Sequence, residues 1–425
     1  MRMNCMAFLA ATFWLGSALA GAVEPPARMA QRVVAGLGTS VEATIFAAGR
    51  SSAAGAALAN GVASHILELD DIHKGSTVHA AAPIIPAALA VAEREHADGQ
   101  RFLLAVAVGY EAALRIGEAV NPSHYRFWHP TGTAATFGAA AAAGSILGLN
   151  SEQMRDALGS AGTQAAGLWE FNADGTMSKH LHPGKAAFNG ILAADLARAG
   201  FTGASRILEG DRGFFRAMSE SYDPTRITDG LGEHWKISEN CFKLHACCGH
   251  THSAIDLALE FLAEHGWSGA EVLDQVASIR IETYGPGYDI VKNCAPATPY
   301  QAKFSIAWCV ASALSGPLRF DVSSPDVHAL LSRTSVTVAD DLTAKYPAAW
   351  PACLTITLRD GTSFARSADF PRGNPENPVS TADLETKFRA MVTPIHGSAV
   401  AERALAGCHS LKSCADMAEA FSHLL

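Results

Sequence analysis

Acidic and histidine side chains are concentrated in residues 64–79, Ser-His-Ile-Leu-Glu-Leu-Asp-Asp-Ile-His-Lys-Gly-Ser-Thr-Val-His. The stretch contains Glu68, Asp70 and Asp71, ends at His79, and has an Ala-rich run on each side. Carboxylates this close to histidines can support proton transfer, because burial and neighbouring charges move their pKa values towards the working pH. A charged helix end followed by a solvated loop fits the same pattern. Both interpretations stay open from this stretch alone.

A second group of reactive side chains lies in residues 125–133, where His129 directly precedes an Ala-rich run from Thr133. Because a helix N-terminus favours anions, this loop can hold a substrate carboxylate. The alternative is an aromatic-packed turn that caps the helix.

Residues 176–187 gather four basic side chains in a segment rich in Gly and Pro, which are Lys179, His180, His182 and Lys185. We expect this segment to be a loop just before the next helix. It is either a small cationic site or a solvated basic loop.

Three histidines and the adjacent pair Cys247 and Cys248 crowd residues 241–252. Structural zinc usually takes Cys pairs separated by two to four residues, with a second pair elsewhere. This crowding on one loop argues against a metal, and we expect instead that Lys243 and His245 face a pocket. The sequence has no P-loop, dinucleotide-binding Gly-rich turn, Gly-x-Ser-x-Gly or His-Glu-x-x-His, so phosphoryl transfer, hydride transfer and the commoner hydrolase designs have no support.

The composition limits the class of protein and its partners. The chain has 425 residues, is 49% hydrophobic and 17% charged, and so can bury a large core. Its net charge of -9, with no basic run, argues against nucleic acid or an anionic membrane surface as a partner. Nine cysteines without regular spacing indicate reduced thiols, which favours a cytoplasmic protein.

Apolar residues at helical spacing dominate the first 200 residues. The predicted helices cover residues 27–37, 53–69, 86–97, 101–120, 133–147, 151–167, 185–199 and 251–265. Residues 278–284 alternate as a half-buried strand does, 335–338 are β-branched, and Asp360-Gly361 marks a hairpin. Helices at 302–315 and 324–331 lie between them, a Gly/Asn/Pro linker occupies 372–378, and helices return at 381–391 and 399–425. We therefore predict a mainly α protein with a helical domain over residues 1–240 and 376–425, interrupted by an inserted α+β lid domain over 241–375.

The first 20 residues have two interpretations. An arginine, an apolar run and an Ala-Leu-Ala end are the parts of a secretory signal peptide, which would make the protein periplasmic or secreted. A buried first helix ended by Gly21 and Pro25-Pro26 fits equally in composition. The single arginine and the missing disulfide pattern favour the core helix.

Several motifs, in their order along the chain, resemble the MmgE/PrpD family. They are Asn60-Gly-x-x-x-His65, the acidic stretch to His79, Gly109-Tyr-Glu-x-x-x-Arg-Ile-Gly117, Trp128-His-Pro-Thr-Gly132, Met177-x-Lys-x-Leu-His182, Lys243 with Cys248-Gly-His-Thr-His252, Ala302-Lys-Phe-Ser305 and the segment from Arg372 to Pro378. The resemblance covers nearly the whole chain. It implies a large all-α domain with a smaller α+β lid, a site in the cleft between them, a homodimer, and chemistry without a metal or organic cofactor. Family members normally carry residues before the first core helix, so the chain is expected to start short of them.

Carried over by position, the resemblance assigns a set of functional residues. The catalytic set is Asp70, Asp71, His79, His129, Lys179 and Lys243, and the substrate-binding set is Glu68, His182, His245 and Trp308. Three residues depart from the family pattern: Glu68 replaces an aspartate, Ala80 a proline and Trp308 a tyrosine. The indole of a tryptophan only donates, whereas a tyrosine hydroxyl also accepts.

The resemblance implies proton abstraction next to a carboxylate of a small polycarboxylate, with positive charge placed where the enolate-like oxygens develop. We expect a lyase that dehydrates or decarboxylates a citrate- or aconitate-like acid. An epimerase or isomerase of an iminodisuccinate-like dicarboxylate uses the same proton chemistry and is the first alternative. A non-catalytic polycarboxylate-binding protein is the second, which the departures at Glu68 and Trp308 would favour.

Overall fold

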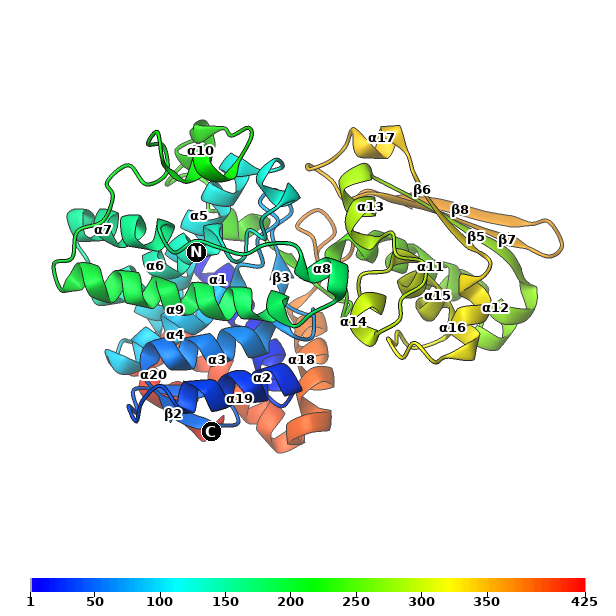
Figure 1. Ribbon diagram of the computed structural model, residues 1–425. Helices are drawn as coiled ribbons and strands as arrows, with labels where there is room; N and C mark the ends of the chain where they lie inside the picture. The colour runs from blue at the N-terminus through cyan, green and yellow to red at the C-terminus, as the bar shows by residue number, and fades with distance from the viewer. Residues whose placement is uncertain (1, 425) are drawn as a thin grey trace. The chain divides into compact units, whose positions relative to one another are not determined.

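The computed structural model describes residues 2–424, and its chain divides into two compact units. Among the described residues, the first unit comprises 2–171, 176–242 and 380–424, and the second comprises 172–175 and 243–379. Helices predominate throughout, which confirms the prediction of a mainly α protein (Figure 1).

Helices build the first unit, together with two short strand pairs. The helices are α1 (Arg2–Gly21), α2 (Pro25–Ala35), α3 (Ala53–His65), α4 (Ala81–Arg94), α5 (Gly99–Val120), α6 (Ala134–Leu147), α7 (Ser151–Gly162), α9 (Ser178–Arg198), α10 (Phe214–Met218), α18 (Thr381–His396), α19 (Ser398–Ser410) and α20 (Met417–Ala420). The strands are β1 (Ala43–Ile45) with β2 (Gly49–Ser51), and β3 (Asp71–Ile72) with β4 (Cys241–Phe242), both antiparallel. The short helix α8 (Phe171–Asp174) begins in the first unit and ends in the second.

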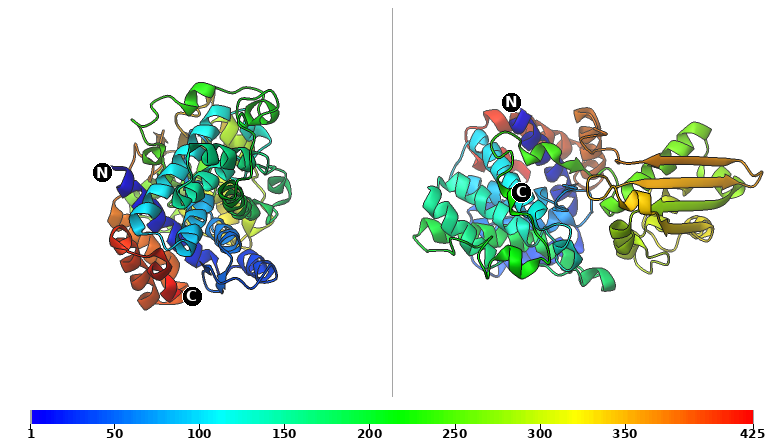
Figure 2. Two further views of the ribbon diagram at one scale, coloured as in Figure 1. Left: turned by 90° about the vertical axis from the view of Figure 1, so that its left-hand side faces the viewer. Right: turned by 90° about the horizontal axis from the view of Figure 1, so that it is seen from above.

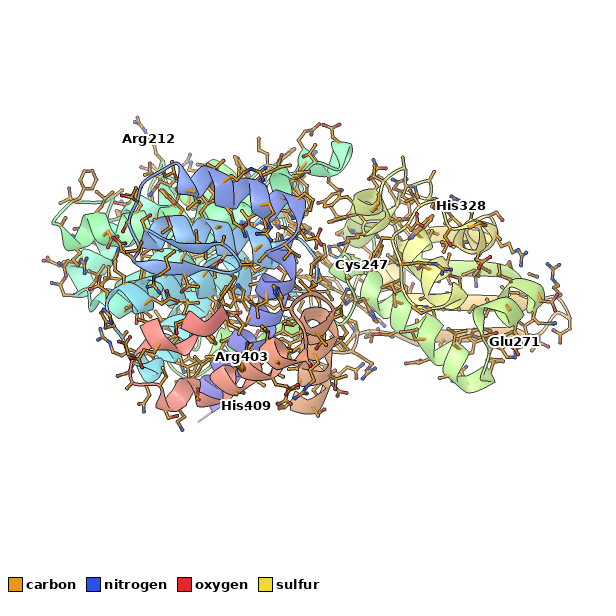
Figure 3. All side chains as sticks on the ribbon, turned by 90° about the horizontal axis from the view of Figure 1, so that it is seen from below. Arg212, Cys247, Glu271, His328, Arg403 and His409 are labelled. Carbon is orange, nitrogen blue, oxygen red and sulfur yellow. The ribbon has the colours of Figure 1, made fainter. Side chains whose placement is uncertain are left out.

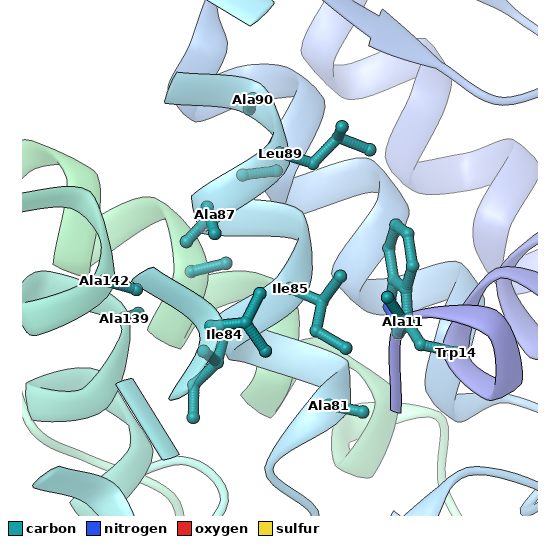
Figure 4. Close-up of a cluster of buried hydrophobic side chains, with 14 of the residues drawn as sticks. Ala11, Trp14, Ala81, Ile84, Ile85, Ala87, Leu89, Ala90, Ala139 and Ala142 are labelled. Carbon is teal, nitrogen blue, oxygen red and sulfur yellow. The ribbon is translucent and has the colours of Figure 1, made fainter. Parts of the chain in front are cut away.

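Small residues allow the helices of the first unit to pack closely. Gly61 of α3 and Gly184 of α9 face each other, since a Cβ atom on Gly61 would lie 2.8 Å from the Cα of Gly184. Ala11 and Trp14 of α1 lie on one side of α4, and Ala139 and Ala142 of α6 lie on the other (Figure 4). The core of this unit is therefore rich in alanine because its helices approach each other closely.

The N-terminal segment forms helix α1 inside this core. Trp14 is 1% exposed, and the ring N–H of His396 donates a hydrogen bond of 2.9 Å to the carbonyl of Leu19. No single helix of the described residues is long and apolar enough to cross a membrane. Residues 5–21 and 25–35 meet that test only as a pair bent by 89°.

A four-stranded sheet organises the second unit. Its strands are β5 (Val276–Thr283), β6 (Thr334–Val338), β7 (Ala352–Leu358) and β8 (Ser363–Ala368), in the order β6-β5-β7-β8. β5 runs parallel to β6 and antiparallel to β7, and β7 pairs with β8 as the predicted hairpin, with Gly361 at a φ of +90° in its turn. Its helices are α11 (His252–His265), α12 (Gly269–Gln275), α13 (Gly285–Val291), α14 (Pro299–Ala302), α15 (Ile306–Ser315), α16 (Pro325–Leu331) and α17 (Asp340–Thr343). Helices α11 and α15 lie against the sheet (Figures 1 and 2).

Polar and charged side chains lie on the surface of both units, among them Arg212, Glu271, Arg403 and His409, whereas Cys247 is buried (Figure 3). All nine cysteines are free thiols. The predicted helix over 302–315 is interrupted before Ile306, because the hydroxyl of Ser305 caps α15 by accepting from the N–H of Trp308.

The basic segment that we expected as a loop is helical instead. Helix α9 begins at Ser178, so Lys179, His180, His182 and Lys185 all lie on its first two turns, with Pro183 inside the helix. The expectation of a loop was wrong because packing against α3, through Gly61 and Gly184, outweighs the local preference of the Pro-Gly pair for a turn.

Candidate active site

The acidic stretch connects α3 to α4 in the first unit. Helix α3 ends at His65, and the chain then turns through Glu68, whose φ is +59°. Asp71 begins β3, and the chain returns through a turn closed by a bridge between His73 and Val78. This path brings both ends of the stretch together, so that the rings of His65 and His79 lie 4.7 Å apart.

Asp70 links these two histidines. Its Oδ2 accepts a hydrogen bond of 2.6 Å from Nδ1 of His65 and lies 3.2 Å from Nδ1 of His79. Nδ1 of His79 also donates to the carbonyl of Asp71 at 2.8 Å, so the neutral ring keeps its lone pair on Nε2. Burial lowers the pKa of His79 to about 4, against the raising effect of Asp70. His79 is therefore a neutral, oriented imidazole at pH 7.

Asp71 supports the scaffold around this stretch. Its oxygens accept hydrogen bonds from the hydroxyl of Tyr110 at 2.5 Å, the amide of Asn240 at 2.9 Å and the backbone N–H of Ala81 at 3.0 Å. Burial raises the pKa of Asp71 to about 7, although these hydrogen bonds lower it. Its carboxyl group thus ties the N-terminus of α4 to α5 and to residue 240.

His129 lies in the turn before α6, as the sequence predicts. Its backbone N–H donates to the carbonyl of Gly167 at 2.8 Å, and its Nδ1 lies 3.0 Å from Nδ1 of His182 on α9. The rings of Trp169 and Phe171 lie 5.1 and 5.8 Å from its ring. Burial, together with the charges of His182 and Lys179, holds the pKa of His129 well below its usual range.

A buried ion pair joins the acidic stretch to α9. Lys179 of α9 bonds to Glu68, and their side chains are 2% and 0% exposed. The positive charge of Lys179 also lowers the pKa values of His79 and His129. Burial and then the charge of Lys185 lower the pKa of His182 to about 3. The first unit therefore brings together most of the predicted residues, which are Glu68, Asp70, Asp71, His79, His129, Lys179 and His182.

The other predicted residues belong to the second unit. Lys243 is buried, and Nε2 of His245 lies 2.8 Å from Oδ1 of Asp256. Trp308 is 0% exposed in the core of that unit, where its indole N–H donates to the carbonyl of Arg319 at 3.0 Å. The indole N–H is thus already hydrogen-bonded within the second unit.

Three supporting residues were absent from the predicted set. His65 and Tyr110 were present in motifs that the sequence displays, but the motifs alone do not reveal that they bond to Asp70 and Asp71. Asn240 carries no signal in the sequence, because only the pairing of β3 with β4 brings it beside Asp71.

Two groups of described side chains have ligand atoms close enough for a metal, within 4.8 Å of one another. They are His65 with His79 and His129, and His73 with Glu118 and Glu239. The charge of Lys179 acts on the first group and opposes a second cation there. In the second group, Nζ of Lys236 lies 3.0 Å from Glu118 and so supplies the positive charge. The absence of a metal stays a prediction.

Comparison with known families assigns both parts of the chain. Residues 10–227 match the MmgE/PrpD N-terminal domain, and residues 245–411 match the MmgE/PrpD C-terminal domain. The chain belongs to the MmgE/PrpD family. The histidine and lysine cluster of the first unit lies within the part matched to the N-terminal domain. The part matched to the C-terminal domain runs beyond the second unit into α18 and α19.

Three proteins named as cis-aconitate decarboxylases or as like them are similar to this chain over most of their length. The cis-aconitate decarboxylase-like protein oryM of Aspergillus oryzae is 28% identical over 394 residues, which are 86% of this chain and 80% of that protein. Human cis-aconitate decarboxylase is 31% identical over 351 residues, 79% of this chain and 72% of the human protein. Cis-aconitate decarboxylase of Aspergillus terreus is 29% identical over 370 residues, which are 79% of this chain and 74% of that protein.

Proposed function

We propose that this family member is a lyase that releases CO2 from a small unsaturated tricarboxylic acid of the cis-aconitate type. The observation that carries the proposal is a buried cluster, in which Lys179 bonds to Glu68 and its charge acts on His79, His129 and His182. The names of its relatives support decarboxylation in particular. They give no support to the epimerase alternative.

The reaction requires groups that stabilise a developing negative charge, and a donor of one proton. When the carboxylate on the CH2 group leaves as CO2, the electrons of the broken C–C bond form a new double bond to the central carbon. The original double bond shifts its electrons to its far carbon, which takes up a proton. Lysine and imidazolium groups stabilise such an allylic carbanion and its neighbouring carboxylates, and an imidazolium can deliver the proton.

The histidines of the cluster suit this role because they are neutral before substrate arrives. A bound anion favours the protonated form of a nearby imidazole. His79 or His129 then takes up a proton as the tricarboxylate binds and donates it to carbon. Asp70 orients His79, and Lys179 acts on the substrate carboxylates from the start of α9.

The family resemblance supplies the lid, the homodimer and the absence of a cofactor, and the irregular spacing of the cysteines supplies the cytoplasmic location. The second unit acts as the α+β lid and contributes Lys243 and His245. The buried Trp308, expected to bind substrate, instead supports that unit from its core. The protein works as a homodimer and in the cytoplasm. The reaction needs no metal or organic cofactor. Light scattering tests the dimer, and activity after exhaustive chelation tests the last point.

Proton NMR of the purified protein with cis-aconitate in deuterated water tests the reaction. We expect a five-carbon product with one deuterium on the carbon next to a carboxylate, together with CO2. Citrate, methylcitrate and aspartate-derived acids are the comparison substrates. A six-carbon product would indicate hydration or dehydration, and inversion without loss of a group would indicate an epimerase. Either outcome, or no turnover of cis-aconitate, contradicts decarboxylation.

A further inference from the structure

Lys185 lies one turn after His182 on α9, and its ammonium group bonds to three backbone carbonyls. Its Nζ donates to the carbonyl oxygens of Ala166 at 2.8 Å, Gln164 at 3.3 Å and Gly132 at 3.4 Å. An ammonium group has three N–H donors, and these three carbonyls satisfy them. Burial lowers the pKa of Lys185 to about 8.

The three carbonyls belong to two segments that hold His129. Gly132 ends the turn that begins at His129, and Gln164 and Ala166 follow α7. The segments touch directly, because a Cβ atom on Gly132 would lie 2.6 Å from the carbonyl oxygen of Ala166. The backbone of Gly167 then accepts the N–H of His129.

We propose that Lys185 is a positioning residue, which clamps the Gly132 and Gln164–Ala166 segments together and so holds His129 against His182. Carbonyl groups that converge this closely repel one another, and the ammonium group offsets that repulsion. A histidine that transfers a proton has to lie within about 0.5 Å of its productive position. The bonds of Lys185 to the two backbone segments provide that precision for His129.

Lys185 also acts on the protonation of His182, because burial and then the charge of Lys185 lower the pKa of that imidazole. The charged and titratable groups that act on His182 are Lys185 and Lys179 on its own helix, His65 at the end of α3 and His129 in the turn before α6. With His182 neutral, one of the two facing Nδ1 atoms can donate and the other accept. Removal of Lys185 therefore disturbs both the place and the protonation of the pair.

The test compares K185M, an unbranched side chain of similar length without charge or donors, with K185R, which keeps the charge and the donors. K236M is the control, because Lys236 is a half-buried lysine that bonds to Glu118 and Glu239 outside the cluster. Turnover of cis-aconitate by the full chain is measured from pH 5 to 9. Imidazole ¹⁵N NMR without substrate follows His129 and His182.

We expect K185M to lower kcat by at least about 10-fold and to change KM less. K185R should retain more of the wild-type kcat. In K185M the pKa of His182 rises and the ¹⁵N signals of both histidines move, whereas K236M leaves them unchanged. Unchanged ¹⁵N signals overturn the proposal, and so does wild-type turnover in K185M. If K185M does not fold, K185Q takes its place.

The activity readout rests on the proposed function, but the NMR readout does not. A wild-type protein without decarboxylase activity contradicts the proposed function, and the ¹⁵N signals alone then decide whether Lys185 holds the pair.

Discussion

The hydroxyl of Ser17 in α1 donates a hydrogen bond of 3.0 Å to the carbonyl oxygen of Leu69, between two acidic residues of the site. Nζ of Lys387 in α18 donates to the same oxygen at 2.8 Å. Helices from opposite ends of the chain therefore support the turn that carries Glu68 and Asp70. The N-terminal helix contributes to the site as well as to the core.

Removal of residues 1–20 should destabilise the first unit so far that it does not fold, because α1 carries Trp14 and Leu15 into the core. The substitution W14A alone should lower the free energy of unfolding by about 3–5 kcal/mol.

The milder S17A should lower the free energy of unfolding by only about 1 kcal/mol but should also lower kcat, since one hydrogen bond to Leu69 is lost. Urea unfolding and turnover measure both effects. T12V is the control, as the hydroxyl of Thr12 bonds to Phe8 within α1. A truncated chain of full stability would contradict this role.

K179M should both inactivate and destabilise the protein, because it leaves the carboxylate of Glu68 buried without its cation. The expected loss is about 3–5 kcal/mol in the free energy of unfolding. The double variant K179M/E68Q should recover most of that stability, yet its turnover should stay at least about 100-fold below wild type. An active double variant would mean that the lysine charge has no part in the chemistry.

D70N should mainly lower turnover, whereas D71N should mainly lower stability. Asp70 bonds to His65 and His79, so D70N should lower kcat at least about 100-fold with little loss of stability. Asp71 caps α4 and bonds to Tyr110, so D71N should mainly lower stability, by about 1 kcal/mol or more. Thermal unfolding and turnover of both variants check this, and an inactive but stable D71N would give Asp71 a direct part in the chemistry.

Binding of a tricarboxylate should take up protons near pH 7. Burial lowers the pKa of His79 to about 4 and that of His182 to about 3, so both are neutral in the free protein. A bound anion raises these pKa values, and affinity therefore falls as pH rises. Titration calorimetry of cis-aconitate or an unreactive tricarboxylate in phosphate and Tris buffers measures the uptake from the difference in heat. Equal heats in both buffers would contradict it.

Glu93 of α4 should make stability fall as pH rises towards neutrality. Burial raises its pKa to about 7 from an ordinary 4.5, although its Oε2 accepts from the N–H of Thr44 at 2.6 Å. The pKa of Glu93 is higher in the folded than in the unfolded state. Its contribution to folding stability is therefore complete below about pH 4.5 and is lost as pH rises through 7. E93Q should match wild type at pH 5 and be the more stable at pH 8, by an amount on the order of 3 kcal/mol. E152Q, at an exposed position of α7, is the control for urea unfolding at both pH values. A pH dependence of stability that E93Q shares with wild type would exclude Glu93 as its source.

Local sequence determined much of the fold. The 3.6-residue period of apolar side chains placed α5, α6 and α11 close to their observed bounds, and the Asp360-Gly361 turn placed the β7–β8 hairpin. These elements are predictable because turn chemistry and amphipathic burial act over a few residues. The motif order also identified the family, which both domain matches confirm.

Only the tertiary structure decided which reactive groups meet and in which form. Lys179 and His182 lie on a helix because α9 packs against α3 at Gly61, an interaction between segments about 120 residues apart in the chain. Glu68 bonds to Lys179, Asp70 to His65 and His79, and Asp71 to Tyr110 and Asn240, although the three acids are near neighbours in sequence. Burial then separates their properties, since it keeps His79 neutral and raises the pKa of Asp71. The sequence alone shows which residue types are available for this chemistry. Their hydrogen-bond partners and their burial exist only once the helices have packed.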